Sequence, residues 1–203
     1  MRRVLCANNL KQIALALQNY ESVHQSLPPA YTVDVEGRPL HSWRTLILPY
    51  LEQQPLYETI DLSKAWDDPV NRGARETKLL VYQCPSADCP PGHTAYLAVL
   101  AANGCFRATG PRRLSEITDN PDSTLMVVDA DSGHAVPWMS PRDTDEQWLL
   151  NLGTVARLPH PGGAQVVCVG GNVLFLSAGL QAATLRALVS IDGNDDNVAQ
   201  EAN

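Results

Sequence analysis

Carboxylates and a histidine with the chemistry to bind a cation flank one apolar segment, STLMVVDA at residues 123–130. Carboxylates that loops bring together hold hard cations such as calcium through their oxygens. The spacing in DNPDSTLMVVDADSG does not match a calcium-binding loop, and aspartates are also common at turns, where they bond the local backbone. A calcium site and plain turn structure therefore both remain as hypotheses, and we favour the second. The candidate ligands are Asp119, Asp129, Asp131 and His134.

Five cysteines form a second reactive group, and Cys84 and Cys89 flank the loop CPSADCPPG. Their spacing does not fit a thioredoxin-type pair, and no second pair or nearby set of histidines indicates a zinc site. Two interpretations stay open. Cys84 forms a disulfide with Cys89 or with Cys6, which requires an oxidising compartment, or the thiols are buried and free.

His160 begins the segment HPGGAQVVCVGGNVLFLS at residues 160–177. As a reactive group it would be a ligand, or the base of a cysteine hydrolase with Cys84 or Cys168 as the nucleophile. His93 is the alternative base, and Cys168 lies among apolar residues, where burial makes a thiol inert. We favour a structural role, in which the His160 side chain bonds the backbone of the hairpin or a loop.

Asp67 and Asp68 are adjacent, so they cannot both face one substrate as an acid–base pair. We predict instead that an aspartate pairs with Arg72 and fixes this loop, with Trp66 packed beneath it. The chain also lacks a nucleophile elbow, a phosphate-binding loop, a dinucleotide fingerprint and a zinc-protease motif. The residues alone therefore predict no catalytic and no cofactor-binding site.

The 203 residues suit one domain, and 44% hydrophobic with 18% charged residues is typical of a globular protein. The net charge of −7 disfavours nucleic acid, and the basic cluster of Arg107, Arg112 and Arg113 is too small to reverse this. No apolar run approaches the ~20 residues that a membrane helix needs, so we expect the chain as written to be soluble. Residues 192–203 are expected to form an acidic, flexible tail.

The clearest structural signal is an apolar stripe that predicts a long helix over residues 2–27, ended by Pro28 and Pro29. A helix of this length is expected to lie across a flat partner such as a sheet. The stripe consists of Cys6, Leu10, Ile13, Leu17, Tyr20, His24 and Leu27.

Residues 28–93 are predicted to form short helices and loops, and residues 94–178 a region of strands. Residues 30–40 are predicted to form an irregular arm or a short hairpin that turns at Glu36 and Gly37. Ser42 is predicted to cap the helix that follows. A further helix is expected over residues 72–80, with short helices near 145–151 and 182–190. Strands are predicted at 94–101, 123–130, 165–169 and 172–177, the last two joined by a two-residue turn at Gly170 and Gly171. Because no βαβ alternation appears, the fold class is α+β with a small antiparallel sheet.

Several segments in this order resemble the "domain of unknown function 1559" family, the pilin-like proteins abundant in planctomycetes. They include RRVLCANNLKQIALALQNYESVHQSLPPA, SWRTLILPYLEQQPLYETIDLSKAWDDPVNR, CPS, ITDNPDSTLMVVDA, VPWMSPRD and the segment at His160. The resemblance covers residues 2–193. It implies a pilin-like or pseudopilin-like single domain, with a long N-terminal helix packed on a small antiparallel sheet.

Full-length proteins of this kind begin with a prepilin-type leader and a hydrophobic helix, so we expect the chain that begins at Met1 to be a trimmed form. The resemblance implies an extracytoplasmic, membrane-tethered subunit related to type II secretion and type IV pilus systems. Its partners would be itself or other pilin-like subunits, bound through the N-terminal helix. The family motif is a histidine followed nine residues later by Asp-Gly. Here His160 is followed by Gly170 and Gly171, so no role of that aspartate carries over.

Three hypotheses of function follow from these patterns. The leading one is a non-enzymatic, pseudopilin-like structural or assembly subunit without a cofactor. The second is a ligand-binding or glycan-binding module that uses Trp43, Trp66 and Trp138 as flat apolar platforms. The third is a hydrolase that uses His160 with a carboxylate or with Cys84.

Overall fold

A computed structural model describes residues 2–154 and 158–193, and it opens with the long helix α1 (Arg2–His24). The predicted stripe of α1 is buried from Cys6 to Leu17, whereas Tyr20 is half-buried and His24 is exposed. The helix ends at His24 rather than at residue 27, because Gln25 adopts a left-handed backbone (φ 58°) that no α-helix continues. No helix among the described residues is both long and apolar enough to cross a membrane.

The main sheet has five strands in the order β7-β4-β5-β8-β9, which confirms the α+β class. The strand bounds are β4 (Tyr96–Leu100), β5 (Leu125–Asp129), β7 (Thr144–Asp145), β8 (Gly163–Cys168) and β9 (Val173–Ser177). Neighbouring strands are antiparallel except for β4 and β7, which pair in parallel, so the sheet is mixed.

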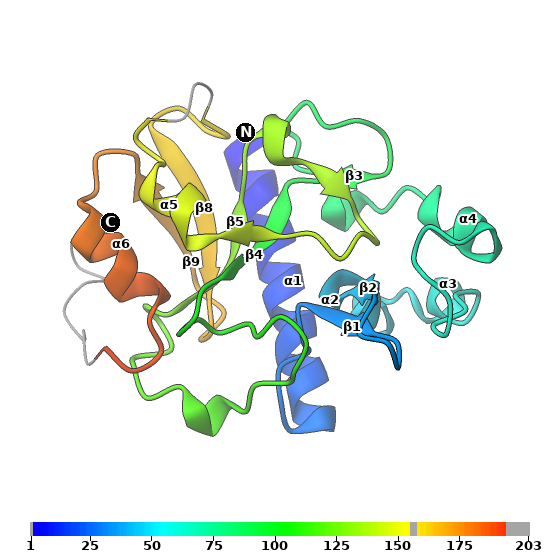
Figure 1. Ribbon diagram of the computed structural model, residues 1–203. Helices are drawn as coiled ribbons and strands as arrows, with labels where there is room; N and C mark the ends of the chain where they lie inside the picture. The colour runs from blue at the N-terminus through cyan, green and yellow to red at the C-terminus, as the bar shows by residue number, and fades with distance from the viewer. Residues whose placement is uncertain (1, 155–157, 194–203) are drawn as a thin grey trace.

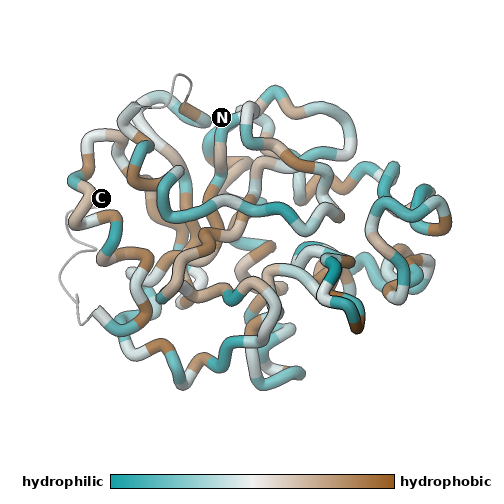
Figure 2. The backbone as a smooth tube through the Cα atoms, in the orientation of Figure 1, coloured by the Kyte–Doolittle hydropathy of each residue, from teal (hydrophilic) through white to brown (hydrophobic). Residues whose placement is uncertain are grey.

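This sheet lies between α1 on one face and the short helices α5 (Glu146–Leu150) and α6 (Ala182–Val189) on the other (Figure 1). Side chains alternate along β4 as a pleated strand requires. Tyr96 and Ala98 belong to the core under α1, whereas Leu97 and Val99 belong to the core under α5 and α6. Both faces of the sheet are therefore buried, and its central strands are predominantly hydrophobic (Figure 2).

The remaining elements surround α1 and one end of the sheet. The predicted hairpin is formed by β1 (Tyr31–Val33) and β2 (Pro39–Ser42), and Ser42 Oγ accepts a hydrogen bond from Arg44 N as the cap of the next helix. The other α and β elements are α2 (Trp43–Leu46), α3 (Gln54–Tyr57), α4 (Arg72–Arg75), β3 (His93–Thr94) and β6 (Val136–Pro137). Short 3-10 turns are η1 (Leu48–Leu51), η2 (Pro69–Asn71), η3 (Leu80–Tyr82), η4 (Leu114–Glu116) and η5 (Ser132–His134).

The helix expected over residues 72–80 is wrong in length, because only α4 forms before the chain turns into η3. The predicted ion pair in this loop is also wrong. Arg72 Nε lies 2.8 Å from Glu76 Oε1, one helical turn away, and Asp68 caps η2 by accepting from Val70 N. The guanidinium over the Trp66 ring is that of Arg75, 5.9 Å from its centroid.

The hairpin β8-β9 forms as predicted, but its turn is longer than the glycine pair. Cys168 N donates to Asn172 O, so residues 169–171 make the loop. Only Gly171 has a positive φ, of 91°. Gly170 serves a different purpose, since a Cβ there would overlap the Asp122 carboxylate. Of the predicted acidic tail, residues 194–203 lie outside the described residues.

Candidate thiol, carboxylate and imidazole site

Four buried side chains with metal-binding chemistry meet beneath α1. Cys6 Sγ lies 2.7 Å from Cys84 Sγ, and Cys84 Sγ lies 3.1 Å from Asp129 Oδ2. The same carboxylate oxygen lies 2.9 Å from His160 Nε2. All four ligand atoms fall within 4.8 Å of one another, and no residue of the four is more than 4% exposed. We call this set the Cys-Cys-Asp-His cluster.

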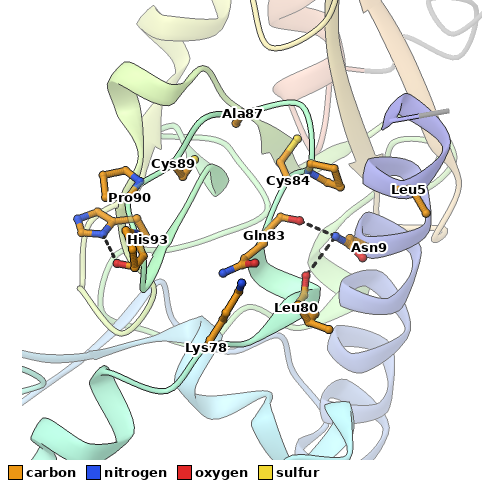
Figure 3. Close-up of a pocket in the computed structure, with 12 residues that line it drawn as sticks. Leu5, Asn9, Lys78, Leu80, Gln83, Cys84, Ala87, Cys89, Pro90 and His93 are labelled. Atoms are coloured by element: carbon orange, nitrogen blue, oxygen red, sulfur yellow. Dashed lines mark hydrogen bonds between the residues drawn. The ribbon is translucent and has the colours of Figure 1, made fainter.

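The two cysteines meet because α1 is bound to the segment that follows η3. Asn9, nearly one turn after Cys6, donates its Nδ2 to the backbone oxygens of Gln83 (2.9 Å) and Leu80 (3.4 Å), as Figure 3 shows. These bonds hold the η3 segment against the helix, and Cys84 directly follows Gln83. The two sulfurs therefore come together although 78 positions separate them in the chain.

The carboxylate and the imidazole reach the cluster from the sheet. Asp129 is the last residue of β5 and pairs in register with Tyr96 of β4. His160 lies at the entry to β8, where its backbone N–H and C=O both bond to Gly163. Gly162 closes that turn with a φ of 85°. The turn after His160 thus places the imidazole beneath the end of β5.

Burial and mutual contact set the ionisation of the cluster. Burial raises the pKa of Asp129 to about 6, against the lowering effect of its hydrogen bond with His160. Burial also acts to lower the pKa of His160, but the bonds with Asp129 and Cys6 outweigh it, and this pKa rises to about 9. The hydrogen bond with Cys84 lowers the pKa of Cys6 to about 4, and the pKa of Cys84 is raised in return. The cluster is a buried site that favours a positive charge on His160 beside the Asp129 carboxylate.

A cavity of about 550 Å³ opens beside the cluster, between the first turns of α1 and the segment from Lys78 to His93 (Figure 3). Cys84 belongs both to the cluster and to the lining of this cavity. Cys89 also lines it, and burial raises the pKa of its thiol to about 11. Cys84 therefore borders the cavity, while Cys6 and Asp129 have no solvent-exposed surface.

The structure separates most of the predicted calcium ligands. Asp131 Oδ2 lies 2.6 Å from His134 Nδ1, and Asp131 also caps η5 through Gly133 N. Asp119 accepts a hydrogen bond from Gly193 N, near the end of the described chain. Only Asp129 of that set enters a group that one ion can reach, and its companions there are two thiols and an imidazole. Calcium binding stays the less favoured of the two hypotheses for these residues.

For the predicted disulfide, the structure places Cys84 beside Cys6, whereas Cys89 lines the adjacent cavity. All five thiols are free in this structure. Cys168 is buried in β8, and burial raises the pKa of its thiol to about 12, in keeping with an inert role. The expected partner of the His160 side chain was backbone, and that expectation is wrong, because the partner is the Asp129 carboxylate. The aspartate missing after residue 169 is thus not needed for a His–Asp pair.

The structure also corrects the prediction that three tryptophans present flat faces to a ligand. Trp43 and Trp138 are 0% and 1% exposed, so neither presents a flat face to a ligand. The indole of Trp43 donates to Asp143 Oδ1, and that of Trp138 packs near Tyr82 with ring centroids 6.0 Å apart. Trp66 is half-buried beside Arg75. A glycan platform therefore loses two of its three tryptophans, and Trp66 alone stays accessible.

Two signals in the sequence pointed toward the cluster without identifying it. Cys6 is predicted both as an apolar position of the helix stripe and as a possible disulfide partner of Cys84, and Asp129 as a possible calcium ligand. A buried cysteine is common, but an aspartate that closes a buried strand is unusual, because aspartate is rarely buried without a partner. Their convergence depends on how α1 lies over β5, which no local pattern encodes.

Comparison with known proteins identifies the family. The family model described as "Protein of unknown function (DUF1559)" matches residues 1–136, about two thirds of the chain. No curated protein and no solved structure matches the chain significantly. The chain therefore belongs to the DUF1559 family.

Proposed function

We propose that this DUF1559 chain is a non-enzymatic, pilin-like assembly subunit that works outside the cytoplasm and packs against copies of itself through α1. The observation that carries the proposal is the two-sided character of this helix. One face of α1 is buried on the sheet, while the opposite face exposes apolar side chains that no part of the described chain covers. Such a helix is suited to form subunit contacts.

The exposed apolar residues of α1 follow two neighbouring lines along the helix. Val4 and Leu15, 62% and 57% exposed, are eleven positions apart, which brings them to nearly the same side at 3.6 residues per turn. Leu5 and Val23, 46% and 66% exposed, are eighteen positions apart and share a second line about 100° away. We call these four residues the outer strip of α1. Lys11 lies on the same side, and the exposed Asn8, Gln12 and Asn19 lie between the two lines, so the strip is a modest and interrupted apolar area.

The absence of catalysis is also part of the proposal, and the burial of the Cys-Cys-Asp-His cluster supports it. His160 is 2% exposed and Asp129 0%, so a substrate would have to displace core side chains to reach them. A hydrolase needs its nucleophile and base within reach of a substrate bond. A buried cluster of this kind is better suited to holding the fold together.

The proposal is tested by anchoring the chain in a membrane and measuring whether its copies associate. The full chain is fused behind an apolar membrane helix, expressed in a bacterial inner membrane with the domain in the periplasm, and cross-linked. We expect a ladder of oligomers from the wild type and its loss in Leu15→Asp, which puts a charge in the outer strip. The matched control is Leu80→Asp, because Leu80 is 74% exposed but lies in η3, off the helix.

Two results would overturn the proposal: a wild type that stays monomeric in the membrane, or a Leu80→Asp variant that loses the ladder as fully as Leu15→Asp. Circular dichroism on both variants verifies that each remains folded, so that loss of oligomers reports on the contact itself.

A further inference from the structure

We propose that Cys6, Cys84, Asp129 and His160 form a structural zinc site that ties α1 to the sheet. The four donors come from α1, the segment after η3, the end of β5 and the entry to β8, and their ligand atoms converge within 4.8 Å. This site does not use the outer strip, although Leu5 of that strip lines the cavity beside the cluster.

The donor types select zinc over calcium. Two thiolates, one imidazole and one carboxylate make a four-coordinate set from the ligands that zinc prefers. Calcium takes six to eight oxygen ligands, and this cluster offers oxygens from only one side chain. Closed sets of four protein ligands are typical of structural zinc sites, whereas catalytic sites keep a position for water.

A cation accounts for contacts that a disulfide leaves unexplained. A Cys6–Cys84 disulfide would consume both thiol protons, so Asp129 Oδ2 would face the sulfur of Cys84 at 3.1 Å without a hydrogen between them. The second oxygen, Asp129 Oδ1, is buried and has no hydrogen-bond partner among the described residues. His160 pairs with Oδ2, but a buried Oδ1 without a partner is costly unless a donor or a cation satisfies it. One divalent ion would bind the carboxylate and both sulfurs together.

Binding zinc needs a small local adjustment. With Zn–S bonds of about 2.3 Å, the sulfurs of a tetrahedral site lie about 3.8 Å apart, so the present 2.7 Å separation must widen by about 1 Å. Cys84 is the residue with room to move, because it lines the 550 Å³ cavity. On binding, the protons that the cluster holds on its thiols and on His160 pass to solvent, so that both cysteines bind as thiolates and His160 as the neutral imidazole, and no oxidant or reductant is required.

The first measurement uses the full wild-type chain, purified without chelator from cells supplied with zinc. We expect about one zinc per chain by elemental mass spectrometry, and five thiols that react after denaturation in chelator without reductant. Cobalt added to the metal-free chain is expected to give the visible bands of a tetrahedral site and thiolate-to-cobalt charge transfer. Chelator is expected to lower the melting temperature of the wild type.

Variants assign the site to its ligands. Asp129→Asn keeps the shape of the side chain and removes the anionic ligand, and Cys6→Ser removes a thiolate. We expect each to reduce zinc affinity by roughly tenfold or more, the scale at which supporting residues already act. The matched control is Cys168→Ser, a buried cysteine outside the cluster, which should retain the full zinc content.

Two outcomes would overturn the zinc site. Three reactive thiols and a mass lower by two hydrogen atoms would show that Cys6 and Cys84 form a disulfide instead. Five reactive thiols with no retained zinc, and no cobalt bands on titration, would leave a hydrogen-bonded cluster only. Both readings come from the wild type, so they hold even if the variants fail to fold.

Discussion

Arg44 and Asp143 form an ion pair of 2.6 Å in which neither side chain is exposed to solvent. Asp143 Oδ1 also accepts hydrogen bonds from the Trp43 indole and from Ala98 N of β4. This pair therefore joins α2 to the sheet. The guanidinium further donates to the backbone oxygens of Tyr96, Trp138, Ser140 and Arg142.

Removing the guanidinium should destabilise the fold strongly. In Arg44→Met the Asp143 carboxylate is left buried without its partner, and breaking a buried pair in this way costs about 3–5 kcal/mol. We expect that loss in the free energy of unfolding measured by urea denaturation. The double variant Arg44→Met/Asp143→Leu should recover part of the lost stability, because no lone charge remains.

The control is Arg72→Met, which breaks an exposed pair with Glu76 and should leave the free energy of unfolding unchanged. An equal loss of stability in Arg44→Met and Arg72→Met would contradict the prediction.

Acid should weaken the fold through His41. Its ring is buried with Nε2 2.8 Å from Lys64 O, and burial lowers its pKa below 6.5 despite that bond and the nearby Asp61 charge. The unfolded chain therefore binds a proton at His41 before the folded chain does. The stability from neutral His41 is complete above about pH 6.5 and is lost as the pH falls toward the folded-state pKa.

The measurement compares urea unfolding of the wild type and His41→Gln at about pH 7.5 and about pH 5. The stability advantage of the wild type should shrink on acidification, by at most about 1.4 kcal/mol per pH unit for one proton. Comparison with the variant removes the contributions of other titrating groups. An advantage that stays constant or grows at low pH would refute the role given to His41.

A methyl group at Gly163 should disrupt the β8-β9 hairpin. A Cβ there would overlap the backbone oxygen of Leu176 on the paired strand, which cannot move without breaking the ladder. We expect Gly163→Ala to cost at least the ~1–3 kcal/mol typical of overpacking. Gly73→Ala is the control, since nothing lies within 4 Å of its Cβ position in α4 and alanine favours a helix. Thermal melts should therefore separate the two variants, and a shared melting temperature would show that the hairpin tolerates the methyl group.

Truncations on the two faces of α1 should behave oppositely. Ile13 is fully buried, so Ile13→Ala is expected to cost about 2–5 kcal/mol through lost burial and the cavity left behind. Leu15→Ala lies on the outer strip and should alter the unfolding free energy by no more than about 0.5 kcal/mol. Urea unfolding measures both changes, and an unchanged dependence of the unfolding free energy on urea concentration shows that each variant differs in stability alone. Comparable losses in the two variants would mean that α1 is covered on its outer side as well.

Local patterns predicted the elements of the fold well because their causes are local. The stripe from Cys6 to Leu17 determines which face of α1 is buried, and the Ser42 hydroxyl caps α2 within two residues. The length of the turn at Gly171 was less predictable. It depends on Gly170 N donating to Pro121 O, a contact with another part of the chain.

The sequence by itself determined the long helix, the hairpin at the end of the strand region and the membership of the DUF1559 family. Only the tertiary structure decided that Cys6 meets Cys84 and that His160 meets Asp129, across 78 and 31 positions. The physical reason is the range of the interactions. Periodicity and capping act within a few residues, whereas the position of a buried polar side chain depends on how whole elements pack. The cluster exists because α1 crosses the sheet where β5 ends and β8 begins.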